Sequence, residues 1–184
     1  MVAAYLVFLA LFGAERIAEV LLSRRNARIA FARGAVESGA QHFRWMALVH
    51  ALFLPACAWE VVALDRPFPG LLGWAAFALA LCAQGLRWWA IASLGWRWNV
   101  RVIVVPGLAP VRSGPYRFVR HPNYIAVVAE MVCVPLAHGA WLSALVFSAL
   151  NAALLYGRIR IEERALGSQW ERAFAGVPRF VPHG

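Results

Sequence analysis

Arg158 and Glu162 are the residues of this sequence whose spacing points most directly to chemistry. They lie four residues apart, so a helix places both side chains on one face and turns Glu163 away from that face. The planar guanidinium of an arginine can hold a carboxylate, enolate or phenolate oxygen in a fixed geometry. A carboxylate beside it can accept hydrogen bonds from a polar ligand. By itself, such a pair is also typical of a solvated helix end.

A second polar motif, Arg120-His121-Pro122-Asn123-Tyr124, precedes an apolar stretch. Proline suits the first turn of a helix, because the backbone N–H that it lacks would have no partner within the helix there. The N-terminus of a helix also offers free amides to an anionic group. The histidine and the tyrosine add an adaptable hydrogen-bonding group and an aromatic face. A His-Pro pair alone carries little information, so the function depends on whether the two motifs meet in space.

The composition indicates a chain that lies largely in lipid. Its 184 residues are 62% hydrophobic and 15% charged, with a mean hydropathy of +0.62, more apolar than a soluble domain of this size can bury. A helical crossing needs roughly 20 apolar residues. We therefore predict an all-α integral membrane protein with about five transmembrane helices. The candidate stretches are residues 2–22, 45–64, 71–92, 122–137 and 140–157.

Only His138 and Gly139 separate the last two stretches, so these helices must form a tight antiparallel hairpin. The hairpin brings the start of the fourth helix beside the end of the fifth, and with them the two polar motifs. The fourth helix is short and should be either broken or buried in protein. The fifth has no breaker after Gly157 and should continue as a polar rod. We predict one domain, in which residues 1–92 form a three-helix part and residues 93–184 hold a catalytic loop, the hairpin with its cofactor pocket, and a cytoplasmic tail.

All 18 basic residues are arginines, and most follow the first and third stretches or lie in the tail. By the positive-inside rule this favours an N-terminus outside and a C-terminus in the cytoplasm, for a multi-pass protein of the inner (plasma) membrane. Topology and anionic lipid headgroups explain the net charge of +9 better than nucleic acid does. Membrane lipids are thus expected partners and nucleic acid is not; the oligomeric state is open.

Several ionisable residues fall inside the apolar stretches. Leaving them unpaired in lipid costs on the order of 2.5–3.5 kcal/mol each on insertion scales, so they should face the bundle interior, some of them in structural pairs with Arg16 or Arg87. Glu130 is the candidate for a substrate contact or for the general base of a phenol. The three cysteines stand singly, and no metal site is expected. The ionisable residues are Glu15, Glu19, His50, Glu60, Arg87 and Glu130.

The run from residue 114 to 124, the hairpin and the Arg-x-x-x-Glu-Glu motif together resemble the isoprenylcysteine carboxyl methyltransferase family of integral membrane enzymes, most strongly over residues 95–166. The resemblance implies S-adenosyl-L-methionine as cofactor, held between the loop, the His-Pro-x-Tyr turn and the last helix, with Arg158 on the substrate side. The cofactor contacts that it implies are Leu108, Ala109, Pro110, Val111, Tyr116, His121, Pro122, Asn123, Tyr124 and Glu162.

Segments 23–26 and 34–39 resemble a bacterial branch of that family, associated with type III polyketide synthases, that O-methylates alkylpyrones or alkylresorcinols. We therefore expect an O-methyltransferase that uses Arg158 and Glu130 on a carboxylate, enol or phenol oxygen of a lipophilic small molecule from the bilayer. This branch favours an alkylpyrone or alkylresorcinol over an isoprenylcysteine-like acceptor. Two alternatives remain. One is an NADPH-dependent membrane reductase of the sterol reductase type, which has a similar Arg-His-x-Asn-Tyr turn, and the other is a non-enzymatic membrane scaffold.

Overall fold

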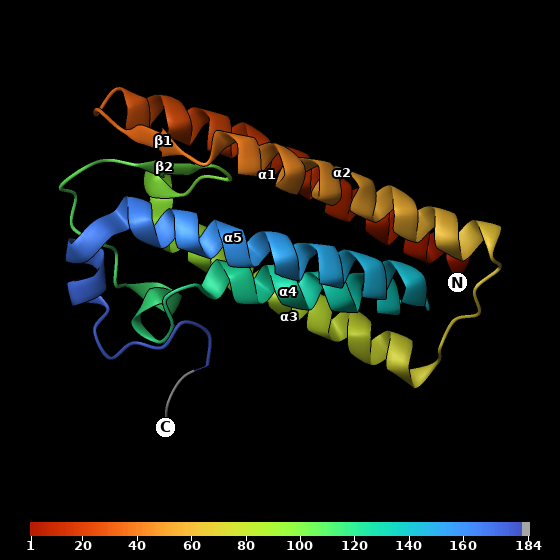
Figure 1. Ribbon diagram of the computed structural model, residues 1–184. Helices are drawn as coiled ribbons and strands as arrows, with labels where there is room; N and C mark the ends of the chain where they lie inside the picture. Colours follow the sequence, from red (N-terminus) through yellow and green to blue (C-terminus); the bar gives the residue numbers. More distant parts are fainter. Residues whose placement is uncertain (182–184) are drawn as a thin grey trace.

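The computed structural model describes residues 1–181 as a bundle of five long helices with a small sheet at one end (Figure 1). Two short 3-10 helices, η1 and η2, lie in the loop between α3 and α4. The predicted fold class, an all-α integral membrane protein, is confirmed. The bounds are α1 (Val2–Phe31), α2 (Ala40–Ala63), α3 (Leu71–Leu94), η1 (Gly95–Arg97), η2 (Gly114–Arg117), α4 (Pro122–Leu136) and α5 (Trp141–Ala173).

Three helical segments among the described residues are long and apolar enough to cross a membrane: Ala40–Ala63, Leu71–Arg97 and Trp141–Ala173. The remaining two long helices depend on their neighbours. α1 carries three charged residues within its apolar stretch, and α4 has 15 residues, about 22 Å of helix. Most of α4 is buried, because it packs between α3 and α5. Of the two alternatives that its length left open, a broken helix or burial in protein, the structure shows burial.

The α4–α5 hairpin is as tight as predicted. α4 ends at Leu136 and α5 begins at Trp141, and Gly139 supplies the left-handed turn with a φ of 75°. α5 continues beyond its apolar part, as expected, but Gly167 interrupts it with a φ of 69°. The residues after this kink fold back toward the start of α4, where the backbone N–H of Arg120 donates to the carbonyl of Pro178.

Glu60 of α2 has a structural role at the end of the bundle where α5 begins. Its carboxylate accepts hydrogen bonds from the backbone N–H groups of Leu142 (3.0 Å) and Ser143 (2.6 Å) at the start of α5 and pairs with Arg66 (3.0 Å). It therefore satisfies amides that the first turn of a helix leaves free and places negative charge at the positive end of the helix dipole.

A two-stranded sheet ties the α1–α2 hairpin to the loop before α4. β1 (Val36–Ser38) pairs antiparallel with β2 (Val102–Val104), and Glu37 lies opposite Ile103. Neither strand was predicted from the sequence. We name the end of the bundle that holds this sheet, residues 95–121 and the tail 167–181 the loop end; the N-terminus lies at the opposite end (Figure 1).

Candidate active site

A cavity of about 860 Å³ lies between the α1–α2 hairpin and the layer of α3, α4 and α5. Its walls come mainly from α1, α2, α4, α5, β2 and the loop at residues 105–111, and α3 contributes Arg87 and Leu94. This volume lies within the range of pockets that bind small molecules and cofactors, about 300–1,000 Å³. The cavity contains two separate polar groups, one at the loop end and one deeper in the bundle.

The polar group at the loop end joins α4 to α5. The Nε of Arg158 donates a hydrogen bond to the hydroxyl of Tyr124 (3.2 Å) and lies 3.8 Å from the carboxylate of Glu162. The Tyr124 hydroxyl in turn donates to Glu162. Arg158 and Tyr124 are buried, and all three side chains line the cavity. The two motifs that the hairpin was expected to unite are therefore in direct contact.

Glu163 points away from this face, as its position on the helix predicted, and contacts a different part of the second motif. One carboxylate oxygen lies 3.1 Å from Nε2 of His121, whose ring stacks on Tyr124 with centroids 5.2 Å apart. Arg179 of the tail holds the same carboxylate at 2.7 Å, and this hydrogen bond raises the pKa of the Arg179 side chain. The tail thus fixes the histidine beside the Arg158 group.

The loop between α3 and α4 forms a further wall of the cavity. Residues 108–111 line it, and Arg97 donates to the carbonyl of Ala109 (2.6 Å), which ties this segment to η1. Tyr116 of η2 also lines the cavity and packs with Trp170 and Phe174 from beyond the kink of α5. Burial raises the pKa of Tyr116 well above its usual value, so its hydroxyl stays protonated.

Nine of the ten residues predicted to contact the cofactor line this cavity; Pro122 does not. Pro122 is fully buried at the first position of α4, where it sets the start of the helix. Its neighbour Asn123 lines the cavity, and its buried Oδ1 accepts no hydrogen bond within residues 1–181. Both residues predicted as catalytic, Arg158 and Glu130, line the cavity as well.

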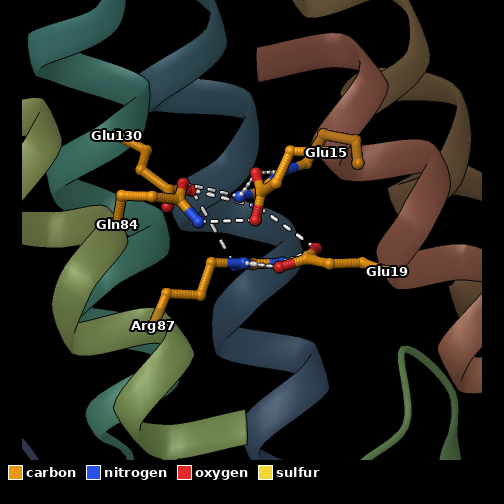
Figure 2. A network of polar contacts seen from close by, with 6 residues as sticks. Glu15, Glu19, Gln84, Arg87 and Glu130 are labelled. Atoms are coloured by element: carbon orange, nitrogen blue, oxygen red, sulfur yellow. Dashed lines mark hydrogen bonds and ion pairs between the residues drawn. The ribbon is translucent and has the colours of Figure 1, made fainter. Parts of the chain in front are cut away.

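The deeper polar group is a network of charges between α1, α3 and α4 (Figure 2). Arg87 holds Glu19 through two hydrogen bonds, of 2.5 and 2.7 Å. Arg16 contacts Glu19 (3.3 Å) and Glu130 (3.4 Å). The expectation that some ionisable residues form pairs with Arg16 and Arg87 is thereby confirmed. The network is completed by Glu15, which contacts Arg16, and by Gln84, which donates to Glu15 at 2.5 Å.

Two parts of the cavity wall were not predicted from the sequence: the residues of α1 and those just beyond the kink of α5. Ile17, Val20 and Leu21 line the cavity from α1, and Ser168 and Gln169 line it from the tail side. Gly167 was a usable signal for the second group, because glycine in a polar helix is typical of a break. No signal in the sequence specifies which face of α1 turns inward.

Comparison with known proteins shows to which family this chain belongs. A model of the isoprenylcysteine carboxyl methyltransferase family matches residues 75–168, which cover nearly all of α3, the loop, α4 and most of α5. The chain belongs to the isoprenylcysteine carboxyl methyltransferase family. It is therefore a member of a family of membrane methyltransferases, and the matched part holds the Arg158 group at the loop end of the cavity.

Two bacterial proteins resemble the chain over most of its length. The uncharacterized protein YpbQ of Bacillus subtilis (strain 168) is 37% identical over 161 residues, which are 87% of this chain and 95% of the relative. An uncharacterized protein of Haemophilus influenzae (strain ATCC 51907 / DSM 11121 / KW20 / Rd) is 26% identical over 154 residues, 83% of this chain and 89% of the relative. Both alignments extend beyond the part matched by the model of the isoprenylcysteine carboxyl methyltransferase family.

Proposed function

We propose that this chain is an S-adenosyl-L-methionine-dependent O-methyltransferase that methylates an oxygen of a lipophilic small molecule. The observation that carries the proposal is the contact of Arg158 with Tyr124 and Glu162 at one end of a cavity whose other walls are largely apolar. A cavity with few polar groups at defined positions is typical of a small-molecule site.

The residues at the loop end fit the proposed cofactor. Its ribose hydroxyls and its ammonium group are hydrogen-bond donors, and the free oxygens of Glu162 and Asn123 are acceptors. The aromatic faces of Tyr116 and Tyr124 suit a cationic sulfur. When bound, the cofactor supplies a methyl group on a positively charged sulfur. Leu108, Ala109, Pro110 and Val111 would form the wall of this pocket.

Arg158 would bind the acceptor oxygen. Its guanidinium favours the ionised form of a carboxylate, enol or phenol and fixes the direction in which the oxygen points. Correct placement of two reactants can lower a barrier by roughly 7–11 kcal/mol, which is the main contribution a methyl transfer needs from a protein. The apolar side chains of α1 and α2 that line the cavity, among them Ile17 and Met46, suit a hydrocarbon tail.

The acceptor class proposed here is an alkylpyrone or alkylresorcinol, with an isoprenylcysteine-like carboxylate as the second candidate. The resemblance of the first half to the polyketide-associated branch supports this order. Glu130, on the same cavity wall as Tyr124, would contact the acceptor. We also propose that the protein spans the inner membrane and contacts its lipids. The loop end would lie in the cytoplasm and the N-terminus outside, because most arginines are at the loop end. No nucleic-acid partner is proposed.

The decisive experiment is to incubate the detergent-purified protein with isotope-labelled S-adenosyl-L-methionine and a total lipid extract, and to identify labelled products by mass spectrometry. We expect the label on an oxygen of a lipophilic compound. Titration calorimetry with S-adenosylhomocysteine and with NADPH distinguishes a methyltransferase from a reductase. Micromolar binding of NADPH without binding of S-adenosylhomocysteine would overturn the proposal. If the protein is instead a non-enzymatic scaffold, Arg158→Ala and Glu162→Ala would leave the phenotype of the cell unchanged.

A further inference from the structure

All five long helices place polar side chains at one level of the cavity. Glu130 of α4 lies 3.4 Å from Arg16 of α1 and 3.8 Å from Arg87 of α3 (Figure 2). On the side of α2 and α5, the side chains of His50 and Asn151 lie beside each other. Six such residues line the cavity, and we name them the polar belt: Arg16, Glu19, His50, Arg87, Glu130 and Asn151.

The polar belt is separated from the Arg158 group by about two helical turns. Glu130 follows Tyr124 by six residues on α4, and Asn151 precedes Arg158 by seven on α5, which correspond to rises of about 9 and 10.5 Å. Because the hydrogen bond between Arg158 and Tyr124 fixes the register of the two helices, both counts place the belt at the same depth. The cavity-lining residues between the two levels are apolar, among them Leu21, Met46, Val127 and Leu155.

Just beyond the polar belt, the cavity ends against the hydrophobic core. The walls there are Phe12, Ala51, Phe53, Leu54 and Met131. Phe12, Phe53 and Met131 belong to the cluster of buried side chains that fills the bundle toward the N-terminus. The cavity is therefore polar near both ends and apolar in the middle.

A plain hydrocarbon end would fit the polar belt poorly, because it would displace water from polar side chains without replacing any hydrogen bond. Two buried belt atoms, Nη1 of Arg87 and Oε1 of Glu130, have no hydrogen-bond partner within residues 1–181. The amide of Asn151 and the ring of His50 can both donate and accept. The two guanidiniums and two carboxylates of the belt balance in charge, and Glu15, the third carboxylate of the network, is 20% exposed. A neutral group that donates and accepts, such as a hydroxyl, therefore suits this level best.

We propose that the polar belt is a second subsite, which binds a hydroxyl group of the acceptor about two helical turns away from the oxygen that is methylated. This inference rests on the proposed methyl transfer and narrows its acceptor class to lipophilic molecules with a distal hydroxyl group. His50 and Asn151 determine this specificity, because they are the two uncharged members of the belt. The charged members hold one another and, as polar groups within a membrane protein, face the interior.

The first test measures binding and needs no turnover. The detergent-purified protein, saturated with S-adenosylhomocysteine, is titrated in a calorimeter with α,ω-alkanediols and with 1-alkanols of the same chain lengths. We expect Asn151→Leu to weaken the best diol about tenfold, the effect of one hydrogen bond, and the matching alkanol less than twofold. Since each ratio compares one compound in two proteins, its partition into detergent cancels. An equal loss for both compounds, or no measurable binding of any diol, would overturn the proposal.

The matched control for Asn151→Leu is Ser148→Ala. Ser148 is a polar residue about one turn earlier on α5 and is not among the cavity-lining residues of the chain from 1 to 181, so its replacement should leave these affinities unchanged. If Asn151→Leu does not fold, the wild type decides. Its affinity should peak at one diol length, because a diol must span the two polar levels, and should rise steadily with length for the alkanols. A steady rise for the diols as well would overturn the proposal.

The second test uses turnover and compares two 4-hydroxy-6-alkyl-2-pyrones whose chains end in a methyl or a hydroxyl group. We expect the wild type to prefer the hydroxyl-terminated compound about tenfold in kcat/KM at the best chain length, and Asn151→Leu to abolish this preference. A wild-type preference for the methyl-terminated compound would overturn the second subsite while supporting the methyl transfer. If the wild type methylates neither compound, the methyl transfer to pyrones fails, and the diol affinities still decide the subsite.

Discussion

Nε of Arg158 on α5 lies 3.2 Å from the hydroxyl of Tyr124 on α4, so one hydrogen bond joins two motifs that are 34 residues apart in the sequence. The contact exists because the α4–α5 turn is too short to allow anything but an antiparallel hairpin. Since both side chains are buried beside Glu162, the tyrosine hydroxyl is held in place by a donor on one side and an acceptor on the other.

Arg158→Lys should slow methyl transfer without weakening cofactor binding. Lysine keeps the positive charge but loses the planar fork that orients the acceptor oxygen. We expect kcat to fall about 100-fold, as when one preorganised donor is removed from an active site, with the Kd of S-adenosylhomocysteine changed less than threefold by calorimetry. Arg160→Lys, an exposed neighbour on α5, is the matched control. A large rise in Kd with an unchanged kcat would assign Arg158 to the cofactor instead.

Glu162→Gln should have the opposite effect. The carboxylate is proposed to accept hydrogen bonds from the cofactor, and a hydrogen bond to a charged group contributes about 1.5–3 kcal/mol. The Kd of S-adenosylhomocysteine should therefore rise roughly 10- to 100-fold, while kcat at saturating cofactor changes little. Glu171→Gln serves as control. Wild-type affinity in Glu162→Gln would remove this residue from the cofactor site.

Arg87→Leu should destabilise the bundle by about 3–5 kcal/mol, because the buried Glu19 carboxylate loses both hydrogen bonds to Arg87 and keeps only the longer contact with Arg16. The double variant Arg87→Leu/Glu19→Leu should recover most of this loss, since the desolvated charge is then removed as well. Thermal unfolding in detergent, followed by circular dichroism, measures both. If the double variant unfolds as early as the single one, the pair does not act as a unit.

Arg179→Ala should loosen the tail where it pairs with the start of α4. The backbone N–H groups of Arg120 and His121 donate to the carbonyls of Pro178 and Arg179, so their hydrogen exchange reports how often the tail detaches. Because an exposed ion pair contributes at most about 1 kcal/mol, we expect exchange at these amides to rise only a few-fold. Arg172→Ala, exposed on α5, should leave it unchanged. Equal rates in both variants would show that the Glu163 contact does not hold the tail.

The sequence predicted the parts of the structure that local rules control. Pro122 indicated the start of α4, and the short His138-Gly139 link indicated the hairpin, which together bring the two motifs into one site. The first apolar stretch was predicted to end at residue 22, but α1 continues to Phe31. Its last turns are polar, so a search for apolar stretches does not detect them.

Other features depend on contacts that distant segments make. The sheet could not be predicted because β1 and β2 have only three residues each and pair with each other from distant parts of the sequence, with Ser38 opposite Val102. The partners of Glu60 were equally hidden, since they are backbone amides on α5. The rotation of each helix about its axis decides which charges of α1, α3 and α4 meet, and single-sequence patterns do not fix it.

The cavity lies between two layers, and only one of them falls within the family match at residues 75–168. The layer of α3, α4 and α5 carries the Arg158 group, whereas α1 and α2 supply the opposite wall. Chimeras that exchange α1 and α2 between relatives would therefore change the wall that faces the Arg158 group. They must keep Arg16, Glu19 and Glu60, which pair with α3 and α4 and cap the start of α5.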